Sequence, residues 1–178
     1  MPTAPCPMDP SQVEATLQGL AADLRARVAP EEELVLLGIR SRGLPLAERL
    51  ADRLGAGGGP RIPVGALDIT LYRDDLTEMV GRPIVRPTEI PFTLKDRTVV
   101  LVDDVLYTGR TIRAALDALL DHGRPRRVML LVLADRGGRE LPIQADLAGI
   151  KVEVPRGHRV SVRLKEIDGV DAVTLEAC

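Results

Sequence analysis

The strongest constraint on the fold of this chain is the thirteen-residue run VVLVDDVLYTGRT, residues 99–111. Its apolar beginning is typical of a strand that is buried on both faces of a parallel sheet. Two carboxylates, Asp103 and Asp104, follow at the end of that strand, where open α/β sheets bind their ligands. A hydroxyl-rich loop then enters a helix, and the first backbone N–H groups of a helix bind phosphate. The run predicts a site for a ligand with hydroxyl groups at one end and phosphate at the other, such as a ribose 5-phosphate.

The loop after the acid pair is suited to phosphate by its residue types. The hydroxyls of Thr108 and Thr111 are donors, and Gly109 lets the backbone approach a ligand closely. A solvated strand end followed by a threonine-capped helix would explain either half of the run alone. It does not explain both halves together, so we interpret the run as a binding site.

The whole chain, residues 1–178, predicts a single α/β domain, because strand and helix patterns alternate along it. This alternation is typical of a mostly parallel, twisted sheet flanked by helices. We predict strands over residues 34–39, 62–72, 98–103 and 128–134, and shorter β segments over 150–154, 160–164 and 170–175. We predict helices from Asp9-Pro10 to Val28, from Pro45 to about Leu54, and from Gly109 to Gly123. The last helix is expected to bury Ile112, Ala115, Leu116, Leu119 and Leu120.

Two polar segments between these elements are further candidates for function. Residues 40–43, Arg-Ser-Arg-Gly, follow the first strand, so they face the same edge of the sheet as the acid pair. Two arginines beside a serine can bind pyrophosphate through their planar forks, although an ordinary turn with exposed arginines has the same composition. Residues 73–91 are polar and aperiodic, and a gap of that length in a compact domain is usually functional or disordered.

Composition excludes several classes of protein. The longest apolar run, residues 128–134, has seven residues, far fewer than the ~20 that span a bilayer. The first residues show no secretory signal pattern, so we expect a cytoplasmic protein. Cys6 and Cys178 are too few for a disulfide framework or a metal cluster. Sequence motifs of P-loop proteins, dinucleotide-binding folds and nucleophile-elbow hydrolases do not occur.

Charge and aromatic content bear on nucleic-acid binding. The net charge is only −2, but residues 110–163 carry eleven basic against six acidic side chains, whereas residues 1–35 carry two against six. A polyanion would therefore prefer the second half of the chain. The three aromatic residues are Tyr72, Phe92 and Tyr107, too few for a protein that stacks on single-stranded bases.

The run over residues 99–111 resembles the phosphoribosyl-pyrophosphate (PRPP) signature of type I phosphoribosyltransferases. From the first helix to about Val170, the chain resembles the PyrR family, which are pyrimidine operon attenuation regulators and uracil phosphoribosyltransferases. The motifs that carry this closer resemblance are Gly38–Gly43, Asp68–Asp75 and Asp135–Pro142. It implies a type I phosphoribosyltransferase fold with a flexible lid at about 73–91 and a small C-terminal β hood at about 135–165.

The resemblance implies an enzyme that converts uracil and PRPP into UMP and pyrophosphate. Mg²⁺ is expected to bind mainly through PRPP, with no direct protein ligand. Asp103 and Asp104 are the expected catalytic pair, which holds the ribose hydroxyls and stabilises positive charge on the ring. The nucleotide-binding set comprises Arg40, Ser41, Arg42, Gly43 and Arg86, together with Val105, Leu106, Tyr107, Thr108, Gly109, Arg110 and Thr111. The lid set is Tyr72, Arg73 and Arg82, and the base-binding hood set is Arg136 and Val160.

Two details of this resemblance can be checked in the backbone and in an apo structure. Loops like residues 40–43 in this superfamily often hold a non-proline cis peptide, so we expect one, or an unusual dihedral, within residues 40–42. Residues 73–85 are expected to be poorly ordered without ligand, because lids are drawn from the least stable parts of a protein.

The resemblance also implies a second function, the binding of pyrimidine-gene leader RNA by a homodimer or higher oligomer that senses UMP and UTP. The candidate RNA contacts are Arg126, Arg127 and Arg139. Where regulatory members generally carry RNA-contacting His, Arg and Thr, this chain has Gln18, Gly19, Ala22, Gly138 and Gln144. These differences remove donors from a phosphate-contacting face, so the sequence leaves RNA binding open. The alternative is a purine or orotate phosphoribosyltransferase of the same fold without RNA binding.

Overall fold

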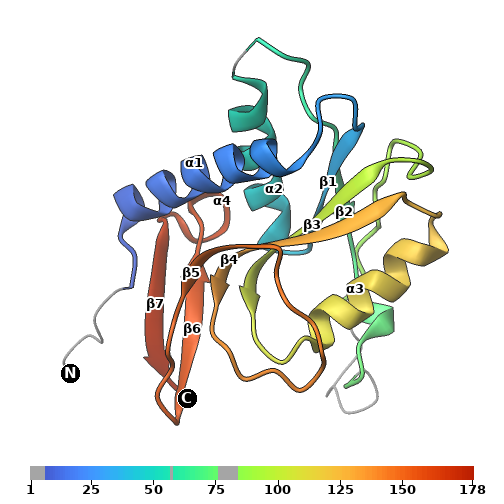
Figure 1. The fold of residues 1–178 in the computed structure, drawn as a ribbon. Helices are drawn as coiled ribbons and strands as arrows, with labels where there is room; N and C mark the ends of the chain where they lie inside the picture. Colours follow the sequence, from blue (N-terminus) through green and yellow to red (C-terminus); the bar gives the residue numbers. More distant parts are fainter. Residues whose placement is uncertain (1–6, 57, 76–83) are drawn as a thin grey trace.

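The structure is a computed structural model, and it describes residues 7–56, 58–75 and 84–178. Its main sheet has five parallel strands in the order β2–β1–β3–β4–β5 (Figure 1). The strands are β1 (Leu34–Ile39), β2 (Val64–Leu67), β3 (Thr98–Leu106), β4 (Arg127–Asp135) and β5 (Leu147–Lys151). The chain moves from β1 to one side and then returns to the other, so the strand order reverses between β1 and β3. Open α/β sheets of this order bind ligands at the carboxyl ends of those two strands.

Helices cover both faces of the main sheet. Helices α1 (Pro10–Arg27) and α2 (Gly43–Gly55) lie on one face, and α3 (Arg110–Asp121) lies on the other (Figure 1). Because side chains alternate along a strand, Val100 and Val102 of β3 pack toward α1 and α2, whereas its neighbours Val99 and Leu101 pack toward α3. Both faces of β3 are therefore buried, which confirms the fully apolar strand expected there.

Local sequence signals explain where α1 begins. The carboxylate of Asp9 accepts the backbone N–H of Gln12 at 2.9 Å, and the Gln12 side chain accepts the N–H of Asp9 at 2.9 Å. This reciprocal capping box, followed by Pro10, stabilises the helix start by about 1 kcal/mol. Val13, Leu17, Leu20, Ala21 and Leu24 are all buried, so one side of the helix predicted here packs into the core.

The C-terminal segment forms a second, two-stranded sheet. Strands β6 (His158–Arg163) and β7 (Ala172–Ala177) pair antiparallel, and the short helix α4 (Lys165–Asp168) connects them. Val162, Leu164 and Val173 anchor this hairpin in the core that α1 and α2 share. A mostly parallel sheet with flanking helices and a small C-terminal β unit confirms the predicted fold class. Strand β5 lies within residues 135–165, yet it belongs to the main sheet.

The structure corrects the end of one predicted strand and the buried face of one predicted helix. The strand over residues 62–72 ends at Leu67, because the Asp68 carboxylate accepts the backbone N–H of Thr70 at 2.8 Å and turns the chain into a single 3-10 turn, η1 (Thr70–Tyr72). Leu120 was expected on the buried face of α3, but it is 57% exposed, and Ala114 and Ala118 are buried in its place. Of the predicted lid, residues 76–83, including Arg82, lie outside the described residues.

Candidate active site

A polar cavity of about 360 Å³ opens at the carboxyl ends of β1 and β3, at the predicted edge of the sheet. Its lining residues are Ile39, Arg40, Ser41, Arg42, Asp68, Ile69, Thr70, Arg73, Ile84, Arg86, Asp103, Asp104, Val105 and Thr111. Nine of these were predicted as site residues from the sequence. Charged and hydroxyl groups from five separate segments therefore meet in one cavity. Its volume lies in the range of sites that bind small molecules.

The acid pair lies at the end of β3. Asp103 is only 6% exposed, whereas Asp104 is less deeply buried. The Asp103 carboxylate accepts the backbone N–H of Asp104 at 2.9 Å, and the Asp104 carboxylate accepts the N–H of Val105 at 2.9 Å. Burial, and then the neighbouring Asp104 carboxylate, raise the pKa of Asp103 well above its usual value. A buried carboxyl at a cavity wall has the perturbed acidity that is common at functional sites.

The predicted phosphate loop leads from the acid pair into α3. Gly109 has φ of +93° at the N-cap of α3, a left-handed conformation that favours glycine. Thr111 lines the cavity of the acid pair and also a second cavity of about 220 Å³, to which Thr108 and Arg110 contribute. The side chain of Leu106 is not part of this site, because it is 1% exposed and packs in the core beneath α3.

The side chain of Arg110 is held by two carboxylates. Its Nε donates to Glu140 at 2.7 Å and its Nη1 donates to Asp74 at 2.9 Å. Asp74 also accepts from Arg113 at 2.6 Å. These contacts join the first described residues of the predicted lid to the start of α3.

The loop after β1 contains the predicted backbone feature. The peptide bond between Arg40 and Ser41 is cis, although neither residue is proline. The Arg40 side chain reaches away along the loop, donating to the Pro87 carbonyl and to Glu89, each at 3.2 Å. At Gly43 a Cβ would lie 2.2 Å from the Val102 carbonyl oxygen, so glycine alone lets the start of α2 approach β3 this closely.

Arg86 connects the far end of the predicted lid to this loop. Its Nη1 donates to the Ser41 hydroxyl at 3.0 Å, and its backbone N–H donates to the Asp68 carboxylate. Asp68 was not predicted as a site residue. Burial opposes its ionisation, but hydrogen bonds from Thr70 and Arg86 outweigh burial and lower the pKa of Asp68. The available signal was the D-x-T pattern of a side-chain turn directly after a strand.

The predicted base-binding residues lie outside this cavity. The guanidinium carbon of Arg136 lies 3.9 Å from the ring centroid of Tyr107, and Arg136 Nη2 donates to the His158 carbonyl at 3.2 Å. Val160 of β6 is 9% exposed and belongs to the hydrophobic core. Tyr107, which is 46% exposed, therefore presents a ring whose one face is covered by a cation.

The predicted RNA-contacting arginines have different environments. Arg139 donates to the carbonyls of Tyr107 and Ile143 at 2.9 and 2.8 Å, and to Asp135 at 2.7 Å. It therefore holds its own loop together, which argues against a phosphate contact. Arg126 and Arg127 are exposed at the start of β4, at the opposite end of the sheet from the acid pair.

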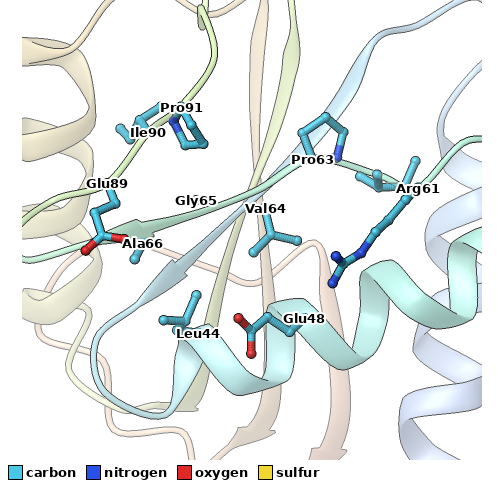
Figure 2. Close-up of a pocket in the computed structure, with 11 residues that line it drawn as sticks. Leu44, Glu48, Arg61, Pro63, Val64, Gly65, Ala66, Glu89, Ile90 and Pro91 are labelled. Atoms are coloured by element: carbon cyan, nitrogen blue, oxygen red, sulfur yellow. The ribbon is translucent and has the colours of Figure 1, made fainter.

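A larger cavity, about 610 Å³, lies along the edge strand β2. In Figure 2, Glu48 of α2 and the segment Glu89–Pro91 flank this strand, with Arg61 at the far end. Eight of its eleven lining residues are apolar residues or glycine, and apart from Glu89–Pro91 of the predicted lid segment, none of the predicted site residues lines it. This cavity has the greater volume, but the acid pair and the other predicted site residues gather in the smaller one.

Comparison with known proteins agrees with the site. Residues 9–160 match the family model described as "Phosphoribosyl transferase domain". A protein of Pelotomaculum thermopropionicum named "Bifunctional protein PyrR" is 53% identical over 168 residues, which cover 94% of this chain and 93% of that protein. The chain belongs to the PyrR family. A PyrR protein of Deinococcus radiodurans is 52% identical over 164 residues, covering 92% of this chain and 90% of that protein.

Solved structures of other phosphoribosyltransferases have folds similar to that of this PyrR family member. A hypoxanthine phosphoribosyltransferase from Staphylococcus aureus matches with a TM-score of 0.71 and 17% identity, covering 97% of this chain and 92% of that one. A purine phosphoribosyltransferase from Pyrococcus horikoshii matches with a TM-score of 0.60 and 24% identity, covering 82% and 86%. At these identities the matches establish the shared architecture alone. Among the described helices, none combines the length and apolar character needed to cross a bilayer.

Proposed function

We propose that this PyrR family member is a uracil phosphoribosyltransferase, which makes UMP and pyrophosphate from uracil and PRPP. The observation that carries the proposal is the meeting of Asp103, Asp104 and the loop 40–43 in one polar cavity. Identities of 52–53% to bifunctional PyrR proteins favour uracil over the purine and orotate alternatives. The purine transferases share the fold but less than 25% of the sequence.

In the proposed reaction, the acid pair acts on the ribose. Asp103 and Asp104 hold its 2′- and 3′-hydroxyls and stabilise the positive charge that develops as the bond from C1′ to pyrophosphate breaks. Uracil N1 forms the new bond to C1′ and releases its proton to solvent, and the pyrophosphate leaves with the electron pair of the old bond. Residues 105–111 hold the 5′-phosphate through backbone N–H groups and the Thr108 and Thr111 hydroxyls.

We assign the leaving pyrophosphate to residues 40–43 and to Arg86. Ser41 and Arg86 already contact each other at 3.0 Å, so one anion between them would meet donors from both segments. We propose that residues 73–91 act as a lid that excludes water during the reaction. The loop from Asp135 and the hairpin β6–β7 form the proposed hood, in which Arg136 and backbone groups near Val160 recognise the base.

Phosphoribosyltransferases generally use Mg²⁺ with PRPP. Among the described residues, no group of three or more histidine, cysteine or acidic side chains comes together that could hold a metal ion. The donors in the cavity are the carboxylates of Asp68, Asp103 and Asp104, which suit an ion brought in by PRPP and still partly hydrated. Such an ion would offset part of the negative charge of the pyrophosphate and so make it a better leaving group.

A nucleobase panel tests the enzymatic proposal directly. The purified chain is incubated with PRPP, Mg²⁺ and one of uracil, hypoxanthine, guanine or orotate, and nucleotide and pyrophosphate are quantified. We expect uracil alone to be consumed, with one pyrophosphate released for each UMP. Turnover of a purine or of orotate, with uracil untouched, would contradict the proposal.

We also propose that the chain binds pyrimidine-gene leader RNA as a regulator, as a homodimer or higher oligomer that senses UMP or UTP. The name of its relatives, "Bifunctional protein PyrR", supports a second function. A cytoplasmic location follows from these partners, because PRPP, uracil and the transcript all occur there.

The RNA face of this chain is nevertheless built differently from that of the regulators it resembles. Gly138 has φ of +72°, and a Cβ there would lie 2.6 Å from Cε2 of Tyr107. A histidine at this position would therefore displace the Tyr107 ring from its place beside Arg136. Gln18 and Ala22 are exposed on α1, and neither carries a charge. RNA contacts must come from other arginines, such as Arg126 and Arg127.

A salt titration tests RNA binding. Binding of leader RNA and of a scrambled hairpin is measured with and without UMP. We expect weak binding whose affinity falls steeply with salt, with the slope reduced by about one for each phosphate-contacting arginine replaced. Binding of neither RNA at low salt would contradict the regulatory proposal and leave the enzymatic one standing.

A further inference from the structure

An ion cluster joins the C-terminal segment to the middle of α2. Arg49 of α2 donates to both carboxylate oxygens of Glu166, at 2.7 and 2.6 Å, and to both of Asp171, at 2.9 and 2.8 Å. Asp171 also accepts the backbone N–H of Lys165 at 2.8 Å. The Arg49 and Asp171 side chains are 15% and 17% exposed, so solvent screens this cluster only partly. The segment between β6 and β7 is thus fixed to α2 independently of any ligand.

Asp168 lies in the same segment and has a different partner. Its carboxylate accepts the backbone N–H of Leu164 at 2.9 Å, which fixes its orientation. It then accepts from Nη2 of Arg42 at 3.0 and 3.2 Å, one contact to each oxygen. Hydrogen bonding from Leu164 first, and then from Arg42, lowers the pKa of Asp168, so the carboxylate is charged at neutral pH.

Arg42 connects this carboxylate to the cavity. It is the N-cap residue of α2 and lines the cavity that contains Asp103 and Asp104. Its side chain is 34% exposed, and its Nε is buried without a hydrogen-bond partner among the described residues. Asp168 therefore occupies one amino group of the guanidinium and leaves the rest of the fork unused. An arginine held at one nitrogen by a fixed carboxylate keeps its remaining N–H groups in a restricted set of orientations.

We propose that Asp168 is a positioning residue for pyrophosphate, acting through Arg42. It fixes the Arg42 fork before PRPP arrives, so that the pyrophosphate meets an oriented donor and less side-chain freedom is lost on binding. This inference rests on the proposed function, since it assigns Arg42 to pyrophosphate. It also makes the segment between β6 and β7, which lies far along the chain from residues 40–43, part of the support for the leaving-group site.

The test compares two neighbours in the same four-residue helix. Asp168→Asn keeps the acceptor for Leu164 but removes the charge that faces Arg42, whereas Glu166→Gln changes a partner of Arg49 and serves as the matched control. Titration calorimetry with Mg²⁺ and PRPP, without any base, measures binding directly. We expect Asp168→Asn to weaken PRPP and pyrophosphate binding about five- to tenfold, and Glu166→Gln to leave both unchanged.

A double-mutant cycle separates positioning from general loosening. Arg42→Ala weakens PRPP binding by itself, and adding Asp168→Asn should then cost nothing further, because the partner through which it acts is gone. In steady-state assays, Asp168→Asn should raise KM for PRPP and leave KM for uracil unchanged. Equal losses in Asp168→Asn and Glu166→Gln, or additive losses in the double variant, would overturn the inference.

Failure of the inference and failure of the proposed function give different results. If the proposed function is wrong, the wild-type chain neither binds PRPP nor consumes it with uracil. If only the inference is wrong, the wild type binds PRPP and makes UMP, and Asp168→Asn does so with the same affinity.

Discussion

The cavity along β2 and the cavity at the ends of β1 and β3 differ in the chemical groups that line them. The cavity along β2 is the larger, about 610 Å³ against 360 Å³, but eight of its eleven lining residues are apolar residues or glycine. The smaller one lies where β1 and β3 end, and it gathers carboxylates, hydroxyls and arginines from five segments. Strand ends at a reversal of strand order supply such groups because every neighbouring loop starts there. Fewer loops meet along the side of an edge strand, so the cavity there is large but collects fewer of these groups.

The largest effect expected from this contrast is on catalysis. Replacing Asp104 by Asn removes one charge beside the ribose position without changing the shape of the strand end. We expect kcat for UMP formation to fall about tenfold or more, with the melting temperature little changed. A steady-state assay and a thermal melt measure both, and an equal loss in each would point to a structural role instead.

A matched pair of arginines sharpens the comparison. Arg86 lines the smaller cavity and contacts Ser41, whereas Arg61 lines the larger one and is 68% exposed. Arg86→Ala should raise KM for PRPP about three- to tenfold, because a phosphate donor is lost. Arg61→Ala should leave it unchanged. Similar KM values for the two variants would remove the distinction between the cavities.

The raised pKa of Asp103 predicts an effect on stability that depends on pH. A carboxyl whose pKa is higher in the folded than in the unfolded state binds more protons when folded. Its contribution to stability is full below about pH 3.9, the unfolded value, and is lost as the pH rises through the folded value. Asp103→Asn, which stays neutral, should therefore melt at a higher temperature than the wild type at pH 7.

The difference in melting temperature should shrink as the pH falls toward 4. Thermal melts of both proteins across this range measure it, and only the difference between them is used, since other carboxylates titrate in both. A difference that grows at low pH would mean that Asp103 is stabilised as a carboxylate, contrary to the effect of its burial.

The smallest effect is expected in the larger cavity. Glu48 is an exposed residue of α2 that lines it, without a role in the proposed reaction. Glu48→Gln should leave kcat and both KM values unchanged and move the melting temperature by no more than about 2 °C. A loss of activity here would show that the larger cavity takes part in function after all.

The sequence predicted the parts of the site that are continuous along the chain. The run over residues 99–111 carries its own strand, acid pair and helix start, so local pattern was enough for β3 and α3. Strand β1 and the helix start at Asp9 were predicted for the same reason. The strand expected up to Tyr72 was too long, because the hydrogen bond from Thr70 to Asp68 overrides the β propensity of the residues around it.

Contacts between distant segments were outside the reach of the sequence. The D-x-T pattern could predict the turn at Asp68, but not that Asp68 accepts the backbone N–H of Arg86, eighteen residues later. Arg139 was assigned to RNA by its charge, but the carbonyls of its own loop and Asp135 occupy its donors. Leu106 fell inside a binding motif, yet strand alternation directs it into the core. Charge and motif membership indicate chemistry, whereas the direction of a side chain depends on the tertiary structure.

The approach of Gly43 to the Val102 carbonyl has a consequence for how far this site can change. Because main chain lies against main chain there, the distance between the proposed ribose site and the proposed pyrophosphate site depends on the absence of a side chain at residue 43. Substitution of the arginine or hydroxyl side chains around the cavity, or a change in base preference, would leave that distance unchanged. Even Gly43→Ala would push these two sites apart, and it would weaken the binding of PRPP whichever base is the second substrate.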